Sequence, residues 1–315
     1  MSEHPHSQLQ QKLIGFVLGG LAGCGAVTFT NPFEVVKTRL QLQGELQKTG
    51  NNPYPNAFTA FYRIFRNEGL RGVQKGLFPA YIYQVLLNGT RLGLYEPLRD
   101  GIQQLSSNKM KPVVAMVSSG AISGIIGAFV ASPLFLVKTR MQSYSGSSNL
   151  SVGFQHEYVQ KGTIHALRTI YKANGIRGLW RGADASMIRT GVGSAVQLST
   201  YDATKQFLGN SGWFSNISDV YLHFSASLMT SLFVVLAMTP LDVVSTRMYN
   251  QQAVGSLYSN AIDCILKTVK TEGITALYKG LIPHYLRIGP HTILTFVLLE
   301  QLKAQYALLY KSEVQ

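Results

Sequence analysis

Three arginines recur at equal spacing within otherwise apolar segments: Arg189 follows Arg91 by 98 residues, and Arg287 follows Arg189 by 98. A guanidinium stays ionised at every relevant pH and can hold a carboxylate through two parallel hydrogen bonds. A charge inside a membrane segment costs at least ~2.5–3.5 kcal/mol, so we expect each arginine to face a wet cavity or a partner. Three fixed positive charges in one cavity suit a small dianion. Any single one could instead be structural and bond a neighbouring carbonyl.

These arginines belong to a repeat about 100 residues long. A motif of proline followed by charged residues begins at Pro32, Pro133 and Pro240, which are 101 and 107 residues apart. Each motif closes a long apolar run, and such self-similarity has to be recognised before a fold is assigned. The prolines predict that the helices break or kink at these positions.

Each repeat contains two stretches long enough to cross a bilayer, for which about 20 residues suffice. The odd members are 13–33, 112–137 and 220–241, and the even members, which hold the arginines, are 77–99, 183–205 and 281–303. Between them lie three shorter amphipathic segments, which we expect at the membrane interface: 57–67, 163–173 and 261–270. The predicted organisation is a tail at 1–12, repeats at 13–108, 109–214 and 215–308, and a tail at 309–315.

Composition favours a membrane protein with an anionic partner. Only 14% of the residues are charged, whereas soluble proteins average roughly 25%. The net charge of +13 indicates attraction to anions, but the basic residues flank apolar runs, which disfavours nucleic acid. Cys24 and Cys264 lie in different repeats and are expected to be reduced. Residues 1–12 contain neither a secretory signal nor a typical transit peptide.

The chain contains no phosphate-binding loop, no zinc-protease motif and no serine-hydrolase motif, and its seven histidines are scattered. We therefore expect no enzyme activity, no metal site and no cofactor.

Three copies of a pattern close to Pro-x-Asp/Glu-x-x-Lys/Arg-x-Lys/Arg, each followed by an acidic-Gly and an aromatic-basic-Gly element, resemble the mitochondrial carrier family over about 13–306. Two elements depart from the pattern after the proline motif, because Asn174-Gly175 replaces acidic-Gly in repeat 2 and Gln74 replaces the aromatic residue in repeat 1. The resemblance implies an all-α membrane protein. Its six transmembrane helices would form a barrel with threefold pseudosymmetry, and three short surface helices would lie on the matrix side. It further implies a monomer in the mitochondrial inner membrane, with both termini in the intermembrane space. Within the family, stretches 88–97, 132–145 and 189–198 are similar to the fungal oxaloacetate carriers.

By this resemblance, the proline motifs form a matrix gate in which the acid of one repeat pairs with the base of another. Carried over residue by residue, Glu34 would pair with Lys138, and Asp242 with Lys37. The alternative is that these charges only anchor the helix ends at the interface.

The third gate pair lacks both charges, because its two positions hold Phe135 and Ser245. Losing both partners of a buried ion pair is often close to neutral, whereas losing one costs ~3–5 kcal/mol. This double loss supports the ring pairing and predicts a matrix gate with two bridges, which opens more easily than one with three. The family's bracing glutamine positions hold Gln41 and Gln142, while the third copy has Tyr249.

At the opposite helix ends, an acid and a base three residues apart occur in each repeat. A helix surface pair of this kind is worth only ~0.2–0.5 kcal/mol, but three copies at equivalent ends suggest a second gate. The resemblance implies the cytoplasmic pairs Glu96–Lys205, Asp202–Lys303 and Glu300–Arg99.

The resemblance places Arg91, Arg189 and Arg287 at the family's substrate contact positions. Thr190 follows Arg189, as in carriers of keto and carboxylic acids, and no acid follows that could hold an ammonium group. The implied substrates are oxaloacetate, malonate, sulfate, thiosulfate and 2-isopropylmalate, moved by proton-coupled alternating access. A malate, succinate or 2-oxoglutarate exchanger is the alternative, and a proton leak on the same fold stays open.

Glycines beside the matrix helix starts suggest bound lipid, because free backbone N–H groups there bind phosphate. In the family such sites hold cardiolipin, here at Gly72, Gly76, Gly178, Gly182 and Gly280. Interfacial anchoring by nearby aromatic residues is equally compatible with these segments.

Overall fold

The computed structural model describes residues 5–46, 53–105, 112–210, 219–252 and 255–313. Within these ranges, the side chains that it leaves undescribed are those of residues 5–13, 16, 198, 202, 210, 219–224, 307 and 309–313. The described chain is built from α-helices and short 3-10 helices and contains no strand.

Six helices are longer than the roughly 20 residues needed to span a bilayer. They are α1 (Pro5–Leu42), α3 (Leu77–Leu105), α4 (Pro112–Ser143), α6 (Ala183–Asn210), α7 (Asp219–Asn250) and α9 (Leu281–Glu313). Within the described chain, two stretches are apolar enough to span by composition alone, Pro112–Ser143 and Ser225–Asn250, with mean hydropathies of 2.0 and 1.8. The other four helices are more polar, as expected of helices that line a wet cavity.

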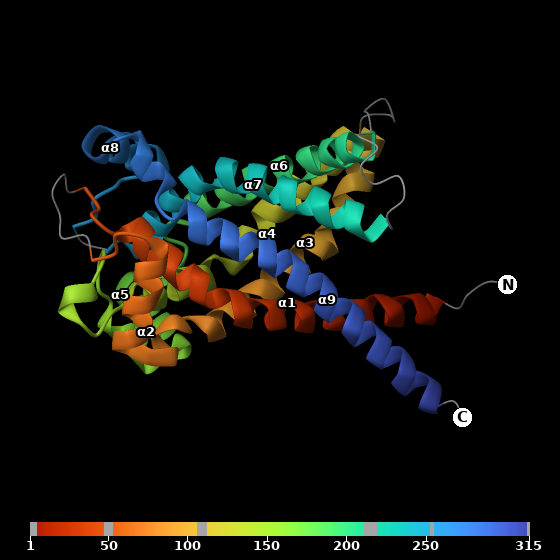
Figure 1. Ribbon diagram of the computed structural model, residues 1–315, viewed down its shortest axis with the longest axis horizontal. Helices are drawn as coiled ribbons and strands as arrows, with labels where there is room; N and C mark the ends of the chain where they lie inside the picture. The colour runs from red at the N-terminus through yellow and green to blue at the C-terminus, as the bar shows by residue number, and fades with distance from the viewer. Residues whose placement is uncertain (1–4, 47–52, 106–111, 211–218, 253–254, 314–315) are drawn as a thin grey trace.

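The six long helices close into a ring. Following the contacts around it, α1 packs on α3, α3 on α4, α4 on α6, α6 on α7, α7 on α9, and α9 returns to α1 (Figure 1). The first long helix of each repeat, α1, α4 or α7, also contacts the other two. Large apolar side chains remain exposed on the outside of the ring, among them Phe29, Phe129 and Phe233. An apolar outer surface of this kind fits a lipid environment.

The sequence suggested that the helices break or kink at the motif prolines, but the helices continue through them. Pro32, Pro133 and Pro240 lie inside α1, α4 and α7, which continue to Leu42, Ser143 and Asn250. The charged residues after each proline are buried by partners from other repeats. The motif is therefore part of a continuous buried helix, although its charges are typical of a helix end. The terminal helices likewise extend into the predicted tails, because α1 begins at Pro5 and α9 runs to Glu313.

The three shorter helices, α2 (Ala57–Val73), α5 (Thr163–Leu179) and α8 (Ala261–Glu272), gather at one end of the ring. Figure 1 shows α1 starting and α9 finishing at the other end. Asn56 and Asn260 cap α2 and α8, each accepting a hydrogen bond from a backbone N–H three residues on. Positive φ angles of 64° and 65° at Gly69 and Gly175 interrupt α2 and α5 where the sequence predicted their ends.

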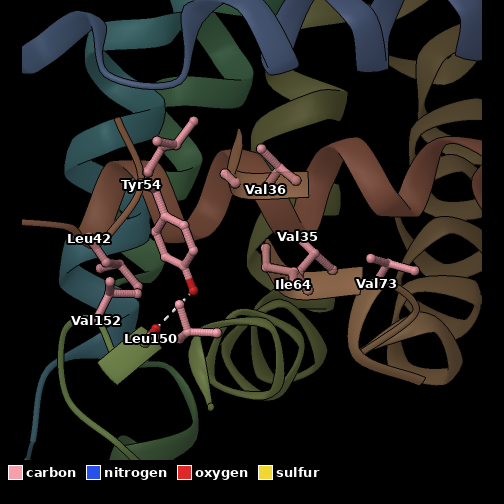
Figure 2. Close-up of a cluster of buried hydrophobic side chains, with 10 residues drawn as sticks. Val35, Val36, Leu42, Tyr54, Ile64, Val73, Leu150 and Val152 are labelled. Atoms are coloured by element: carbon pink, nitrogen blue, oxygen red, sulfur yellow. Dashed lines mark hydrogen bonds between the residues drawn. The ribbon is translucent and has the colours of Figure 1, made fainter. Parts of the chain in front are cut away.

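A buried cluster fixes α2 to the end of α1 (Figure 2). Val35 and Leu42 of α1 pack with Ile64 of α2 and with Leu150 of the short 3-10 helix η1 (Ser148–Leu150). The buried Tyr54 hydroxyl donates to the Leu150 carbonyl at 2.8 Å. Two further 3-10 helices, η2 (Glu157–Lys161) and η3 (Ile274–Tyr278), complete the same end. Repeat 1 is therefore tied to repeat 2 outside the ring as well as within it.

The glycines that directly precede α3, α6 and α9 lie against a neighbouring repeat. A Cβ atom at Gly76, Gly182 or Gly280 would come within 3.1–3.3 Å of backbone atoms of α4, α7 or α1 respectively. At Gly72 and Gly178 it would instead meet the side chain four residues earlier in the same helix. Close packing alone thus explains why these positions hold glycine, and lipid binding there remains a prediction.

Candidate functional site

A central cavity of about 140 Å³ lies inside the ring. Its lining includes all three repeated arginines together with the two acids and two lysines of the proline motifs. The ionised side chains are Arg91, Arg189, Arg287, Lys37, Lys138, Glu34 and Asp242. Five bases face two acids, so the lining has a surplus of three positive charges. The sequence had assigned these groups to two separate functions, and the structure places them around one space.

Two buried ion pairs close the cavity at the proline-motif end. Lys138 Nζ lies 2.7 Å from Glu34 Oε1, and Lys37 Nζ lies 2.7 Å from Asp242 Oδ2. Each pair joins two repeats in the order that the ring pairing predicts. Gln41 reinforces the second pair by donating to Asp242 Oδ2 at 2.9 Å. With all four charged side chains nearly inaccessible, the four together seal this end.

Gln142 does not contact an ion pair as Gln41 does. Its Nε2 donates to Asn31 Oδ1 at 3.2 Å, and its Oε1 accepts from Thr38 Oγ1 at 3.0 Å. It therefore links α4 to α1 beside the gate. The predicted bracing of a bridge is present at Gln41, while Gln142 joins the helices through neutral groups.

Aromatic rings fill the place of the third ion pair. The Phe135 ring packs against Tyr83 and Tyr249, with centroids 5.1 and 5.0 Å apart. Lys138 Nζ lies 5.6 Å and the Arg189 guanidinium carbon 5.3 Å from the Phe135 ring centre, distances at which a cation is attracted to the ring face. The side of the gate without charges is thus held by packing and by cation–π contacts.

The sequence reasoning missed Tyr83, which contacts both Phe135 and Arg189. Its hydroxyl lies 3.4 Å from Arg189 Nη2 and its ring 5.4 Å from Lys138 Nζ. A signal was available, because residues 83, 87 and 91 share one helix face, and the last of these is a cavity arginine. Following that face backwards from Arg91 would have identified the tyrosine.

Two of the cavity arginines approach the gate acids without bonding them closely. Arg189 Nη1 is 3.7 Å from Asp242 Oδ1, and Arg287 Nε is 3.8 Å from Glu34 Oε1. Thr190 Oγ1 lies 3.4 Å from Arg189 Nη2. Among the described residues, the Nε atoms of Arg189 and Arg287 are buried and have no hydrogen-bond partner. Buried donors of this kind normally have a partner, so these two atoms are candidates for contact with a bound anion.

Arg91 lies farther from the gate. It lines the central cavity and also a neighbouring pocket formed with α1, which contains Gln84 and Tyr95. No hydrogen bond or ion pair joins it to another residue in the described part of the chain. The three arginines therefore differ in depth, with Arg189 the most buried.

At the opposite end, one predicted pair is absent. Arg99 pairs with its neighbour Asp100 at 2.9 Å, while Glu300 is exposed and is not its partner. Lys303 is exposed, Lys205 is half-buried and Glu96 is exposed, whereas the side chain of Asp202 lies outside the described residues. Arg99 reaches its sequence neighbour, and the ion pairs that join different repeats lie at the proline end. Glu300 and Arg99 are therefore not paired in this state, and their part in a second gate stays a prediction.

A family model described as "Mitochondrial carrier protein" matches residues 10–106, 109–212 and 218–308, one match for each repeat. The chain belongs to the mitochondrial carrier family. Its six-helix ring is thus the carrier barrel, with the three shorter helices on its surface. The protein is a transporter of the mitochondrial inner membrane and not an enzyme, as the sequence predicted.

Among curated proteins, this mitochondrial carrier is 47% identical to the mitochondrial oxaloacetate transport protein of Saccharomyces cerevisiae, over 95% of this chain and 91% of the relative. It is also 47% identical to mitochondrial citrate transporter E of Aspergillus niger, over 91% of each chain. The mitochondrial 2-oxoglutarate/malate carrier protein of Bos taurus is 38% identical over 96% of this chain and 93% of the relative.

Proposed function

We propose that this carrier transports oxaloacetate and related small divalent anions, namely malonate, sulfate, thiosulfate and 2-isopropylmalate, by alternating access. The observation that carries the proposal is the set of buried arginine donors without partners in a cavity that holds a surplus of positive charge. A dianion can occupy two guanidinium groups at once, with two hydrogen bonds to each. Such a ligand also compensates the cost of holding these charges away from water.

The names of the relatives support an organic acid as the main substrate but differ in the size of that acid. Two proteins with the same 47% identity to this chain are named for a dicarboxylate and for a tricarboxylate. The cavity of about 140 Å³ favours the smaller anion. An obligatory dicarboxylate/2-oxoglutarate exchanger is the second candidate, supported by the 38% identical relative that is named a 2-oxoglutarate/malate carrier.

The contacts between arginines and gate acids suggest how binding couples to opening. Asp242 and Glu34 each attract one lysine of the gate and one arginine of the cavity. An anion bound to Arg189 and Arg287 competes with these acids for the arginines. The acids then lose part of the positive field that holds them, and the gate loosens only when the cavity is occupied.

We further propose that the end with the proline motifs and surface helices faces the matrix and that both termini face the intermembrane space. The carrier is proposed to act as a monomer. Cardiolipin is proposed to bind beside the starts of α3, α6 and α9. At the start of α9, a pocket lies between the Asn56 cap of α2 and the segment at Lys279 and Gly280. The polar α2 start and a lysine at that pocket suit a phosphate group.

The test of substrate and site is uptake of labelled oxaloacetate into liposomes that contain the purified protein. Replacing Arg91, Arg189 or Arg287 by alanine removes charge-assisted hydrogen bonds worth ~1.5–3 kcal/mol, so uptake should fall roughly 10- to 100-fold. Arg66→Ala is the matched control, because Arg66 is exposed on α2 and bonds only Tyr62. Normal transport by all three cavity variants would contradict the proposal.

The transport mode is tested with the same liposomes, empty or preloaded, under a pH step. Entry of oxaloacetate and sulfate into empty liposomes, driven by an inward proton gradient, is the expected result. Entry of 2-oxoglutarate alone, and only against internal malate, would instead identify the obligatory exchanger.

A further inference from the structure

The arginine that ends each proline motif occupies an equivalent position in all three repeats. Its Nε donates to a backbone carbonyl of another repeat: Arg39 to Gln142 at 3.1 Å, Arg140 to Tyr249 at 3.0 Å and Arg247 to Gln41 at 3.2 Å. All three are buried. A buried guanidinium needs a compensating anion, because its separation from water is costly.

Repeats 1 and 3 supply that anion from the adjacent surface helix. Arg39 holds both oxygens of Glu68 at 2.6 and 2.8 Å, and Arg247 holds both oxygens of Glu272 at 2.6 and 2.8 Å. A lysine contacts each carboxylate as well. These lysines are Lys75 and Lys279. Two bases therefore share one glutamate in each of these repeats.

Repeat 2 has the bases but lacks the acid. Asn174 occupies in repeat 2 the position that Glu68 occupies in repeat 1. Each is followed four residues later by a glycine, and a Cβ built on that glycine would lie 2.4 Å from the Asn174 Cβ in repeat 2 and 2.3 Å from the Glu68 Cβ in repeat 1. The shorter side chain of Asn174 is exposed and does not reach Arg140. The base that matches Lys75 is Arg181, and no hydrogen bond or ion pair joins it to a described residue.

The hydrogen bonds of Arg140 show what is missing. Its Nη1 donates to the Tyr158 hydroxyl and its Nη2 to the Gln251 carbonyl at 2.8 Å. Arg39 makes the equivalent bonds to Tyr54 and Tyr144, and then two more to its glutamate. Within the described chain, Arg140 therefore has two N–H groups left over, on the two nitrogens that would face a carboxylate.

A cavity of about 310 Å³ occupies this place. Its lining includes Arg140, His156 and Gln252, and it reaches the surface at the exposed residues Glu157 and Asn174. Glu157 is the acid of this lining, but no ion pair joins it to Arg140. This volume exceeds the 140 Å³ of the central cavity, so a small carboxylate can be accommodated here as well.

We propose that this cavity is a second anion site, outside the transport cavity, that binds a soluble carboxylate in the place of the missing glutamate. Arg140 holds the carboxylate with its two spare N–H groups. Arg181 occupies the sequence position of Lys75 and Lys279 and supplies a second positive charge from outside the cavity lining. The rim is polar, with Asn174, Glu157 and Gln252, which suits a solute from the aqueous phase better than a lipid.

The electrostatic environment of His156 agrees with an uncompensated positive site. Burial, together with the charges of Arg140 and Arg181, lowers the pKa of His156 to about 4. Its imidazole is therefore neutral at physiological pH, and its Nε2 lies 2.9 Å from the Asn250 carbonyl. It adds no charge to the site and leaves the two arginines as the bases that attract the anion.

The test measures thermal unfolding of the purified carrier in detergent, in sodium malonate and in sodium chloride at equal ionic strength. Malonate should raise the midpoint of the wild type by a few degrees more than that of Asn174→Glu, which places a built-in carboxylate in the site. In chloride, Asn174→Glu should unfold at a higher temperature than the wild type. Both proteins keep the central cavity intact, so malonate bound in that cavity raises both midpoints equally and does not affect the difference between them.

Asn67→Glu is the matched control, because it adds the same charge to the exposed face of the equivalent helix in repeat 1. It should keep the wild-type response to malonate. Equal malonate shifts in the wild type and Asn174→Glu would overturn the proposal. So would a loss of stability in Glu157→Gln as large as that in Glu68→Gln, since Glu157 would then be the internal counter-ion.

Inorganic phosphate and mixed micelles containing phosphatidylglycerol distinguish the sources of the anion. A shift specific to the wild type with phosphate, as with malonate, supports a soluble ligand. If the phospholipid alone produces that shift, the site takes a lipid headgroup and the assignment to a soluble carboxylate is wrong.

Discussion

Phe135 and Ser245 occupy the two gate positions where the ring pairing would place a third acid and base. Phe135 compensates for the lost charges by contacts with two tyrosine rings and two cations. These contacts are shorter in range than an ion pair and depend on close packing. The gate of this carrier therefore has two sides held by charge and one held by aromatic rings.

Replacing Phe135 by leucine should destabilise the sealed state. Aromatic pairs are worth ~0.5–1.5 kcal/mol each beyond their area, so the loss of two such pairs is expected to cost about 1–3 kcal/mol. The measurement is the thermal midpoint in detergent without substrate. Phe233→Leu is the matched control, because Phe233 is 47% exposed on α7 and should be nearly neutral. Equal midpoints for the two variants would refute the structural importance of the aromatic cluster.

At the scale of elements, the apolar runs, the helical spacing of apolar residues and the helix-ending glycines located most of the helices. The surface helices were predicted within a few residues because glycine with positive φ interrupts or ends each one, at Gly69, Gly175 and Gly273. The ion pairs Glu34–Lys138 and Lys37–Asp242 could be assigned because the repeat supplies the register between distant segments.

What the sequence could not show depends on long-range contacts. The helices were expected to break where charges follow Pro32, Pro133 and Pro240, because charge normally marks the end of an apolar helix. Those charges are buried by other repeats, which no local pattern reveals. The sequence shows Asn174 in place of the glutamate in repeat 2, but that this glutamate would face Arg140 is visible only when the three repeats are compared in space.

The junction before α6 gives a prediction at this scale. Gly182 has a φ of 82°, and a Cβ there would lie 3.2 Å from backbone atoms of Met248 and Tyr249 in α7. Alanine should therefore cost about 1–2 kcal/mol for the backbone conformation and a further 1–3 kcal/mol for the close contact. Gly162→Ala isolates the first contribution, since Gly162 has a φ of 97° with open space around it. Thermal unfolding of both variants should rank Gly182→Ala as the less stable, and the reverse order would show that the junction does not pack this tightly.

At the scale of the whole molecule, buried ion pairs seal the ring at the proline end, whereas the Glu300–Arg99 pair is not formed at the other end. Contacts among α1, α4 and α7 accompany the closed ion pairs, while Arg99 pairs locally with Asp100. The sequence encodes both sets of gate residues but does not indicate which set is closed. Alternation requires that the two ends exchange these roles, with the arginine cavity between them.

Single cysteines can report which end is open. The background replaces Cys24 and Cys264, both free thiols, by serine. Gln197→Cys places a thiol in the exposed cavity lining on α6, whereas Ser245→Cys places one at a fully buried gate position on α7. In reconstituted liposomes without substrate, a membrane-impermeant thiol reagent should label Gln197→Cys from the side opposite the surface helices and leave Ser245→Cys unlabelled.

Oxaloacetate should then expose Ser245→Cys to reagent on the surface-helix side, because occupied arginines release the gate acids. Labelling of Ser245→Cys at the same rate with and without substrate would show that the proline end is not a gate that substrate controls.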